Sequence, residues 1–385
     1  MTIQWALITG EYPPDPGGVS DYSFLVAKGL AAAGDLVKVY TPRKSGPPPD
    51  IEGVVVRSLP DQYGIRSLIQ IDRDLHSGPK PDRVLVQYVP HAFGWKAMNV
   101  PFAEWLNRRV SKHFNLWVMF HEVSFPLVKR PLRHRFLSHV NRYMARSIAQ
   151  SAKRIFVSST RWGDLLHEIT RSHPPIEWRP VPSNILEEAR PDVDPLLRSK
   201  YLQANQHQLI GHFGTYGNSV RQLMKATLPE ILLADSHRAI LLMGKNSLEF
   251  RDEMRSYQPL VAERIHATGM LPSNMLATYM LACDWIYQPY DDGVSTRRTS
   301  LMGALALGCP IITTLGPYSE PIWEESDSVL LAPSSKPYDL IRTVDSALRT
   351  SPEQRLHLGK KAAQVYEDNF ALEHTLNALR SGKLM

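Results

Sequence analysis

The sequence contains very little cysteine: only Cys283 and Cys309 occur among 385 residues, and both lie in apolar segments. This scarcity excludes a fold held together by disulfides and indicates a reducing compartment. No uninterrupted apolar run approaches the roughly 20 residues that span a bilayer. Residues 1–8 lack the basic and long apolar regions of a signal peptide. We therefore expect a cytoplasmic protein.

The chain also lacks the Gly-x-Gly-x-x-Gly fingerprint of dinucleotide-binding domains. The loop after the first expected strand, residues 9–22, is instead stiffened by prolines and carries Gly17 and Gly18 just before a helical pattern. Glycines at this place let backbone N–H groups approach a ligand, although an ordinary turn explains them about equally well. No acidic residue closes the next strand at 37–40. We therefore expect no dinucleotide cofactor.

Positive charge is unevenly distributed. The chain has 44 Lys and Arg against 38 Asp and Glu, and residues 1–190 hold 25 of the basic and 17 of the acidic residues. Within 108–154 there are eleven basic residues, and Glu122 is the only acidic one. Such a segment favours an anionic partner, namely a membrane surface, an acidic substrate or nucleic acid. A basic face that merely contacts solvent is an equal alternative.

Short apolar runs alternate with helical patterns along the chain, which is typical of parallel sheets built from β-α-β units. Strands are expected at 3–9, 36–41, 53–58, 83–88, 115–120, 154–158, 208–213, 238–243, 263–267, 284–288, 310–314 and 328–331. Helices are expected at 20–33, 63–76, 97–112, 131–150, 160–171, 219–234, 246–258, 273–282, 297–307, 336–349 and 352–381. The fold class is therefore α/β, with two doubly wound Rossmann-like domains, 1–185 and 186–365, facing each other across a cleft.

The strongest functional signal lies in residues 289–314, which follow the apolar run 285–287. An apolar strand runs into a polar loop, and the helix that follows ends at Gly308. The first turn of that helix is expected to carry the hydroxyl and guanidinium side chains of Ser295, Thr296, Arg297, Arg298, Thr299 and Ser300. Helix N–H groups and the helix dipole favour an anion, and arginine adds charge-assisted hydrogen bonds. The pattern predicts a diphosphate site, although a capped helix with solvated arginines would show the same pattern.

Three further strands of the second half end in glycine turns with polar or basic neighbours. The residues of interest there are Gly214, Thr215, Arg221, Lys225, Gly244, Lys245, Met270 and Leu271. Because the carboxyl ends of parallel strands meet at one edge of a sheet, four such ends predict a single site. In the first half, His121 follows the strand at 115–120, where it reaches the equivalent edge of its own domain. A purely structural or solvated histidine is the alternative.

With these residues, the chain resembles the GT-B glycosyltransferases, in particular family four of their sequence classification. The resemblance covers nearly the whole length. It rests on the Gly-Gly-Val loop at 17–19, the strand-end histidine, the stretch 269–289 and the helix ending Ala-Leu-Gly-Cys-Pro. It implies that the second domain binds a nucleotide-sugar, that the first holds most of the acceptor site, and that a last helix, 366–385, crosses back toward the first domain.

The resemblance also implies roles for single positions. The glycine pair 17–18 would approach the donor phosphate or the acceptor, and His121 would lie near the transferred sugar. The backbone at 270–271 would meet the base, and the loop 295–299 would face the diphosphate and the sugar.

Two departures from the family pattern matter. Many members carry two glutamates eight residues apart, and those positions are Ser295 and Gly303 here. The second glutamate often holds the donor ribose, so that contact must come from elsewhere or be missing. Members also commonly place an arginine and a lysine where this chain has Thr215 and Arg221. The residues expected to supply positive charge are Arg221, Arg297 and Arg298, with Lys225 in reserve; these arginines and His121 are the expected catalytic residues.

The sequence thus predicts a glycosyltransferase that moves a sugar from a nucleoside diphosphate sugar to a polysaccharide, lipid-linked or small-molecule acceptor. Fixed arginines that stabilise the leaving diphosphate make a metal unnecessary, and neither Asp-x-Asp pair, 72–74 or 192–194, is assigned to one. The resemblance implies retention of anomeric configuration. The alternatives are a sugar-nucleotide epimerase of the same fold and a non-catalytic sugar- or nucleic-acid-binding module. Nucleic acid is not expected, because no motif for it is present.

The basic segment 127–150 allows two interpretations. Its apolar residues recur at helical spacing, which is typical of a helix packed on the core. The alternative is peripheral attachment to anionic lipid at the inner face of the membrane, where the protein would meet a lipid-linked acceptor.

Overall fold

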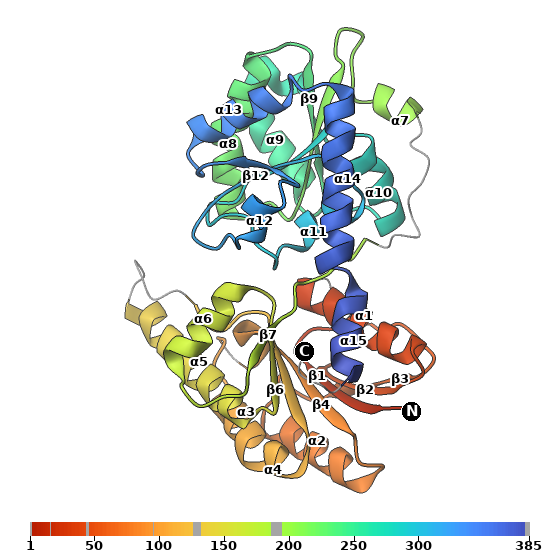
Figure 1. Cartoon of the computed structure of the whole chain (residues 1–385), viewed down its shortest axis with the longest axis vertical. Helices are drawn as coiled ribbons and strands as arrows, with labels where there is room; N and C mark the ends of the chain where they lie inside the picture. Colours follow the sequence, from red (N-terminus) through yellow and green to blue (C-terminus); the bar gives the residue numbers. More distant parts are fainter. Residues whose placement is uncertain are drawn as a thin grey trace. The chain divides into compact units, whose positions relative to one another are not determined.

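The computed structural model describes residues 2–15, 17–43, 46–94, 96–125, 132–185 and 195–381, with the backbone alone at 132–134 and 195. The chain divides into two compact units, one formed by Met1–Val181 with Leu372–Met385 and the other by Pro182–Ala371. Each unit contains one parallel sheet with helices on both faces (Figure 1). The predicted α/β class with two Rossmann-like domains is therefore confirmed.

The first unit is built on a seven-stranded sheet in the order β3-β2-β1-β4-β5-β6-β7. The strands are β1 (Gln4–Thr9), β2 (Leu36–Pro42), β3 (Val54–Leu59), β4 (Arg83–Tyr88), β5 (Leu116–Phe120), β6 (Arg154–Val157) and β7 (Ile176–Trp178). All neighbouring strands run parallel. The chain order reverses between β1 and β4, so the loops after these two strands flank the switch point at which ligands of such sheets bind.

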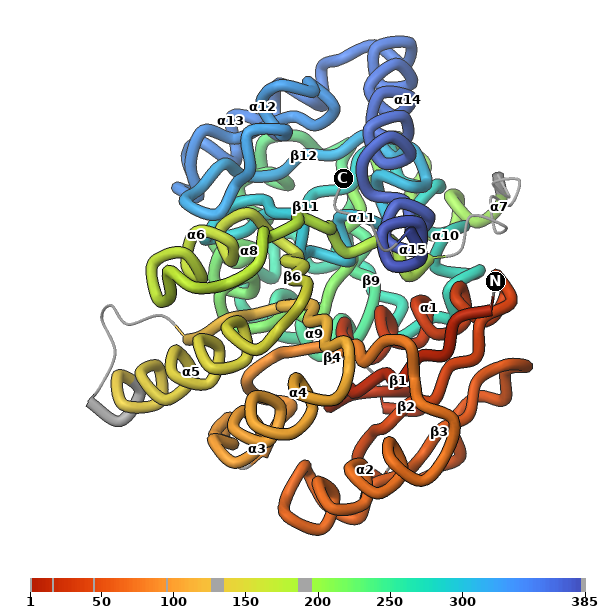
Figure 2. The backbone as a smooth tube through the Cα atoms, turned by 60° about the horizontal axis from the view of Figure 1, so that its bottom comes forward, coloured from red at the N-terminus to blue at the C-terminus, as the bar shows by residue number. Residues whose placement is uncertain are grey.

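Helices cover both faces of this sheet. They are α1 (Gly18–Ala32), α2 (Ile65–Ser77), α3 (Val100–Trp105), α4 (Ser111–His113), α5 (Leu132–Ser151), α6 (Thr160–Ile169) and α15 (Leu372–Ser381), with the short turns η1 (Pro90–Ala92) and η2 (Leu106–Val110). Alternate residues of β1 face opposite sides: Trp5 and Leu7 pack with α1 and α15, whereas Ala6 and Ile8 pack with α2, α3, α5 and α6. Figure 2 shows α2, α3 and α5 gathered on one side of the sheet and α1 on the other.

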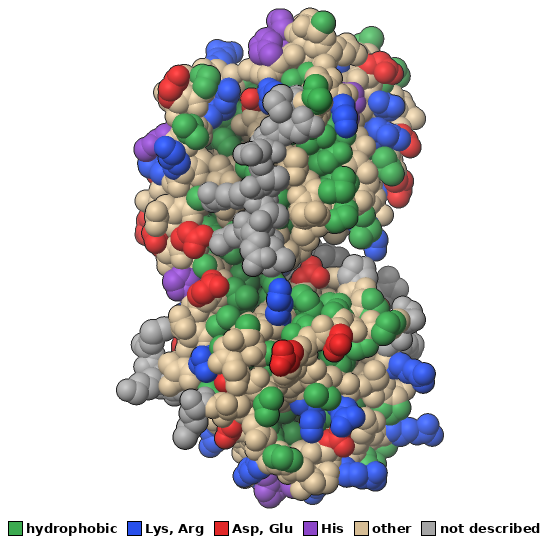
Figure 3. Space-filling view, turned by 90° about the vertical axis from the view of Figure 1, so that its right-hand side faces the viewer, with side chains coloured by type: hydrophobic (Ala, Val, Ile, Leu, Met, Phe, Trp, Pro, Cys, Tyr) green, Lys and Arg blue, Asp and Glu red, His purple; other side chains and the backbone are tan. Residues whose placement is uncertain are grey.

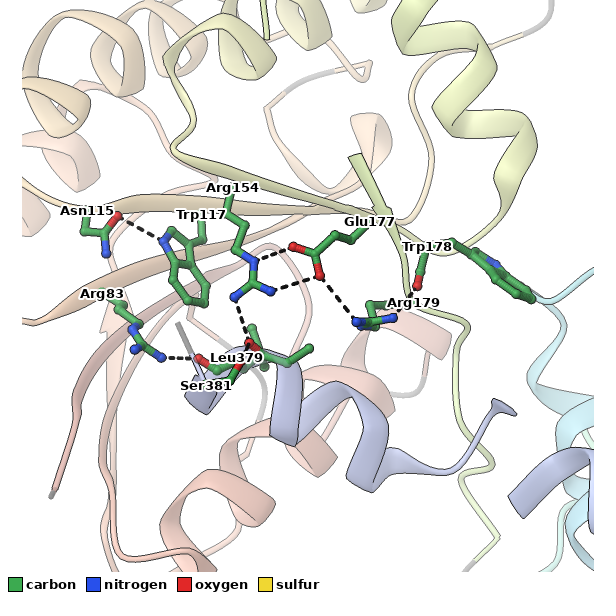
Figure 4. A network of polar contacts seen from close by, with 10 residues as sticks. Arg83, Asn115, Trp117, Arg154, Glu177, Trp178, Arg179, Leu379 and Ser381 are labelled. Carbon is green, nitrogen blue, oxygen red and sulfur yellow. Dashed lines mark hydrogen bonds and ion pairs between the residues drawn. The ribbon is translucent and has the colours of Figure 1, made fainter. Parts of the chain in front are cut away.

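The last helix, α15, is fixed within the first unit by the buried Arg154 and the half-buried Arg83 (Figure 4). Arg154 binds Glu177 through two hydrogen bonds, of 2.5 and 2.9 Å, and donates a third of 2.8 Å to the carbonyl of Ala378. Arg83 donates to the carbonyl of Leu379. The last carbonyls of a helix lack partners within it and carry partial negative charge, so guanidinium groups at this end stabilise the helix.

The second unit is built on a six-stranded parallel sheet in the order β10-β9-β8-β11-β12-β13. Its strands are β8 (Gln208–Phe213), β9 (Arg238–Met243), β10 (Ile265–Ala267), β11 (Trp285–Gln288), β12 (Ile311–Thr314) and β13 (Leu330–Ala332). Its helices are α7 (Pro195–Ser199), α8 (Asn218–Leu233), α9 (Ser247–Tyr257), η4 (Pro259–Arg264), α10 (Ser273–Leu281), α11 (Thr299–Ala306), α12 (Ile322–Glu325), α13 (Pro337–Ala347) and α14 (Pro352–Asn369). Here the chain order reverses between β8 and β11.

The faces of this second sheet are covered by different helices. Buried side chains of α8, α9 and α13 pack on one face, and α10, α11 and α14 lie on the other (Figure 1). Both faces of the central strands are therefore buried, so a ligand can reach these strands only at their ends.

Every expected strand is present, with ends shifted by at most two residues. The short elements β7, α7 and α12 were not expected, because three to five residues carry little periodicity. The single helix expected at 352–381 is wrong: it is two helices, α14 and α15, separated at Phe370 and Ala371. Phe370 is almost fully buried and its ring lies 5.5 Å from that of Trp323, so packing of the second unit fixes the break.

Candidate functional site

Three strand-end loops of the second unit are bonded to one another. The N–H of Gly214, after β8, donates to the carbonyl of Met243 at 3.1 Å. The N–H of Gly244, after β9, donates to the carbonyl of Gly269, after β10, at 3.0 Å. Gly244 has φ +102°, and a Cβ there would lie 2.4 Å from the carbonyl oxygen of Gly214. Only glycine fits this position, so the loops after β8, β9 and β10 form one packed surface.

The other predicted residues of this surface differ in exposure. Thr215 and Lys245 are exposed, and the carbonyl of Thr215 accepts a 3.2 Å hydrogen bond from Asn246. The side chain of Met270 is 67% exposed, whereas Leu271 is half-buried. An exposed methionine beside a fixed backbone turn suits the predicted contact with a flat base, which stays a prediction.

A chain of side-chain contacts joins the loop after β8 to the loop after β11, across the switch point. Gln288, at the end of β11, donates a 2.9 Å hydrogen bond to the carbonyl of Phe213 and accepts one of 3.4 Å from the hydroxyl of Tyr290. That hydroxyl also lies 3.2 Å from the Oγ of Ser300 on α11. The predicted proximity of the β8 and β11 loops is therefore present in the structure.

The helix after this loop begins at Thr299, two residues later than the expected start at 297, and so leaves Ser295 and Thr296 outside its first turn. Ser295 and Thr296 are fully buried in the preceding loop. The N–H and the hydroxyl of Thr296 both donate to the carboxylate of Glu320, at 3.1 and 2.7 Å, and Trp323 donates a further 2.8 Å bond to it. This buried carboxylate holds Thr296 out of the helix. Neither group of Thr296 faces solvent, so its predicted donor contact requires the loop to move.

Arg297 and Arg298 stand together at this loop and share one carboxylate. Asp292 bonds to Nη2 of both, with its Oδ1 2.5 Å from Arg298 and its Oδ2 on Arg297. The guanidinium of Arg298 lies 4.6 Å from the centre of the Tyr290 ring, and that of Arg297 lies 5.4 Å from the Tyr318 ring. The side chain of Arg297 is 19% exposed and that of Arg298 is 28% exposed, so both are accessible to a ligand.

Arg221 and Lys225 on α8 have different partners. Arg221 donates to the carbonyl of Tyr216 at 2.8 Å and forms ion pairs with Glu249 and Glu253 of α9, at 3.0 and 2.9 Å. Lys225 also pairs with Glu253. Within the described part of the chain, these two cations and the pair Arg297–Arg298 thus bind different carboxylates. A shared role of all four with one anion stays a prediction.

At the edge of the first sheet, His121 follows β5 and is almost completely buried. Its Nε2 lies 2.8 Å from Oε1 of Gln87, and its ring packs edge-on against Tyr22 at 4.7 Å. Burial lowers the pKa of His121 to about 3, so the imidazole is neutral at physiological pH. A neutral imidazole can donate a hydrogen bond to a sugar hydroxyl or accept one from it. It offers no positive charge to a phosphate.

The glycine pair after β1 lies at the switch point of the first sheet. A Cβ on Gly17 would lie 2.7 Å from Oε2 of Glu11, whereas Gly18 has nothing within 4 Å. The Glu11 carboxylate is the end of a flexible side chain that can turn away, so space alone does not require glycine at either position. Glu11 also bonds to Nε2 of His91, at 3.2 Å, and this hydrogen bond is the main cause that raises the pKa of His91.

Several residues of these edges were not singled out from the sequence. They are Glu11, Gln87, His91, Asp292, Tyr318, Glu320 and Trp323. Asp292 lay inside the stretch that carried the signal, and its place five residues before Arg297 was the available hint. Glu11 lay inside the loop 9–22. The others lie on different segments, which come together only when each sheet folds.

Gly303, where the family resemblance predicts a ribose-binding glutamate, is closely packed in the structure. A Cβ at this position would lie 2.7 Å from Cδ1 of Ile185 and 3.9 Å from Oγ of Ser183. Both neighbours are buried. A longer side chain at Gly303 would require the buried side chain of Ile185 to shift, so the packing favours a small residue here.

In the residues that the structure describes, no group of three or more His, Cys, Asp or Glu side chains is arranged to hold a metal ion. Asp72 of the pair 72–74 binds Arg109 at 2.8 Å, and the pair 192–194 lies outside the described residues. The face drawn in Figure 3 carries Lys and Arg interspersed with Asp and Glu.

The expected membrane segment 127–150 is described in part, because 127–131 lie outside the described residues. The rest forms α5, whose inner face includes the buried Met144 and Ile148. Its outer face exposes two aromatic side chains, Phe136 at 63% and Tyr143 at 50%, together with exposed arginines at 135 and 146. Among the described helices, none combines the length and the apolar character that crossing a membrane requires.

Several solved structures share this fold along nearly the whole chain. The chain is similar to sucrose-phosphate synthase from Thermosynechococcus elongatus, with 16% identity, 98% of each chain covered and a TM-score of 0.71. It is similar to WaaG, a glycosyltransferase involved in lipopolysaccharide biosynthesis, with 18% identity, 98% of this chain and 100% of that one covered, and a TM-score of 0.68. HepE of Anabaena, solved with UDP and glucose, has 14% identity, 98% of each chain covered and a TM-score of 0.67.

These matches show that the chain has the GT-B fold. Residues 17–183 in addition match the family described as Glycosyl transferase 4-like domain. The chain thus has the fold of these structures, and its residues 17–183 are similar to the glycosyl transferase 4-like domain, in agreement with the resemblance found in the sequence. No protein among those with curated function matches the chain by sequence. The epimerase and the non-catalytic module are not favoured by these findings.

Proposed function

We propose that the protein transfers a sugar from a nucleoside diphosphate sugar bound by its second unit to an acceptor hydroxyl bound mainly by its first. The single observation that carries this proposal is the pair of adjacent guanidinium groups, Arg297 and Arg298, at the switch point of the second sheet. They directly precede the N-terminus of α11. The first N–H groups of a helix lack partners within it, so they and the arginines together suit a diphosphate.

The chemistry follows from where charge develops. The bond between the anomeric carbon and the phosphate oxygen breaks, and its electron pair stays on the leaving diphosphate. A bond forms from the acceptor oxygen to the anomeric carbon, and the acceptor proton passes to the departing phosphate oxygen. Guanidinium groups already in place stabilise the negative charge of the leaving group more in the transition state than in the ground state.

The other predicted residues take supporting roles. His121, neutral in its buried pocket, exchanges a hydrogen bond with a hydroxyl of the transferred sugar, and the backbone at 17–18 approaches the donor phosphate or the acceptor. Backbone at 214–215 and 244–245 borders the donor, and 270–271 meets the base. Arg221 and Lys225, already paired with Glu249 and Glu253, contribute to the field around the diphosphate rather than binding it first.

The reaction proceeds without a metal and with retention of configuration. Support for the first point is the arginine pair, which supplies the charge that a divalent cation supplies in other transferases. Support for the second is the resemblance to family four. Transfer that persists in excess EDTA and a product with the anomeric configuration of the donor, read from the NMR coupling constant, are the expected results. Loss of activity in EDTA, restored by a divalent cation, or an inverted product would contradict these points.

UDP-sugars are the first donors to test, because HepE of the same fold was solved with UDP-glucose. The protein is incubated with a panel of nucleoside diphosphate sugars, with and without a mixture of glycan and lipid-linked acceptors, and release of the nucleoside diphosphate is measured. Release that depends on the acceptor supports transfer. Conversion of the donor to an epimer without any acceptor would contradict it.

The exposed aromatic and basic face of α5 favours one finer proposal: attachment to anionic lipid at the cytoplasmic face of a membrane, where a lipid-linked acceptor is presented. Arginines attract acidic headgroups, and Phe136 and Tyr143 insert at the level of the headgroups. Co-sedimentation with vesicles tests this. Binding to vesicles containing phosphatidylglycerol, reduced by Phe136→Ser, is expected; equal binding to purely zwitterionic vesicles would remove the proposal.

A further inference from the structure

Asp292 occupies the position between the two guanidinium groups that an anionic ligand would take. Each of its oxygens bonds to a different arginine, Oδ2 to Arg297 and Oδ1 to Arg298. A single phosphoryl group bridging the pair would make the same two contacts through two of its oxygens. The carboxylate is 22% exposed and thus reachable from solvent.

The arginines have other contacts that hold them in place. Arg298 lies against the ring of the buried Tyr290, and its carbonyl accepts the first helical N–H bonds of α11. Arg297 lies against the ring of Tyr318 and bonds to the Oγ of Ser295 at 3.4 Å. The guanidinium groups can therefore keep their positions when the carboxylate is removed.

The backbone of Asp292 is also fixed, while its side chain is not enclosed. Its carbonyl accepts a 3.1 Å hydrogen bond from the N–H of Tyr318. The next residue, Gly293, has φ +92° and lies so close to Gly316 that a Cβ would meet its backbone nitrogen at 2.5 Å. Only rotation of the side chain is needed for the carboxylate to leave the arginines, because the main chain stays in place.

We propose that Asp292 is an internal counter-ion of the arginine pair and that the donor's diphosphate displaces it. This inference rests on the proposed function of Arg297 and Arg298. Without ligand, one negative charge offsets part of two positive charges, so the pair does not repel itself apart. With the diphosphate bound, the carboxylate turns to solvent. The competition weakens binding of the free nucleoside diphosphate, which favours release of this product after transfer.

The test compares two neighbouring aspartates. Asp292→Asn removes the competing charge with little change of shape, and Asp291→Asn removes an equal charge from an exposed side chain one residue away. Binding of inorganic pyrophosphate and of UDP is measured by calorimetry at low ionic strength, with melting temperatures recorded for every variant. Asp292→Asn should bind both ligands at least about fivefold more tightly than the wild type, and Asp291→Asn should differ by less than about twofold.

Equal or weaker binding by a folded Asp292→Asn variant would overturn the inference and leave Asp292 with a positioning role. Unchanged binding by a folded Arg297→Ala/Arg298→Ala double variant would instead refute the proposed donor site. Should Asp292→Asn not fold, a crystal structure of the wild type with UDP decides. A carboxylate more than about 4 Å from at least one guanidinium supports displacement, and one still bonded to both refutes it.

Discussion

The buried carboxylate of Glu320 gives a sharp prediction about the donor loop. It accepts hydrogen bonds from the N–H and hydroxyl of Thr296 and from the indole of Trp323, and it is 3% exposed. Each charge-assisted bond of this kind contributes about 1.5–3 kcal/mol. Glu320→Gln keeps an acceptor oxygen for the N–H of Thr296 and the indole, and its NH2 group can donate to the Thr296 hydroxyl, but all three bonds lose the charge of the carboxylate. A neutral hydrogen bond contributes about 0.5–1.5 kcal/mol, so the free energy of unfolding should fall by about 2–4 kcal/mol over the three bonds.

Urea denaturation followed by tryptophan fluorescence measures this change, and Trp323 itself lies at the altered contact. The matched control is Glu324→Gln, which removes the same charge from an exposed position of α12 and should leave the midpoint unchanged. Because the loop before α11 would lose its anchor, the KM for the donor should rise in Glu320→Gln while that of Glu324→Gln should not. An unfolding midpoint equal to that of the wild type would refute the reasoning.

Three further predictions concern stability. Burial holds the pKa of His121 near 3, below the value of about 6.5 in the unfolded chain. The contribution of the neutral ring to the free energy of unfolding is therefore lost as the pH falls from about 6.5 toward 3. His121→Gln should reduce the loss of stability between pH 7 and pH 5 by about 2 kcal/mol, and an unchanged pH profile would contradict this. Gly244→Ala places a Cβ against a carbonyl oxygen at a residue with positive φ, so it should lower the melting temperature by several degrees. Gly18→Ala, where a Cβ meets open space, should leave the melting temperature unchanged. Equal melting temperatures of the two variants would show that the turn relaxes. Glu177→Gln leaves the buried Arg154 without its carboxylate, so the free energy of unfolding measured by urea denaturation should fall by about 3–5 kcal/mol. A fall of less than about 1 kcal/mol would mean that other contacts compensate.

The fold could be predicted largely from the sequence, because alternation of short apolar runs with helical patterns is a local signal. The strands at 208–213 and 238–243 were predicted to the residue. The exact start of α11 was not predictable, since it is set by Glu320, a residue 24 positions after Thr296 that reaches it only in the folded sheet.

The candidate site was predictable at the level of loops but less so at the level of partners. Arg221 was predicted to supply positive charge to the donor because it follows the glycine turn and stands where family members commonly have a lysine. The structure pairs it with Glu249 and Glu253, whose spacing of four residues on α9 places both carboxylates on one helix face. Which helix faces which loop depends on the order of strands in the sheet, and a single sequence carries little information about that order.

The arginine pair is tested most directly by the affinity of a nucleoside diphosphate for Arg297→Ala, Arg298→Ala and the double variant. Arg342→Ala, an exposed arginine of α13, serves as the control. Calorimetry with UDP should show a loss of about tenfold or more for each single variant, because each removes charge-assisted hydrogen bonds to a phosphate. An affinity for UDP that stays at the wild-type value in a folded double variant would contradict the account.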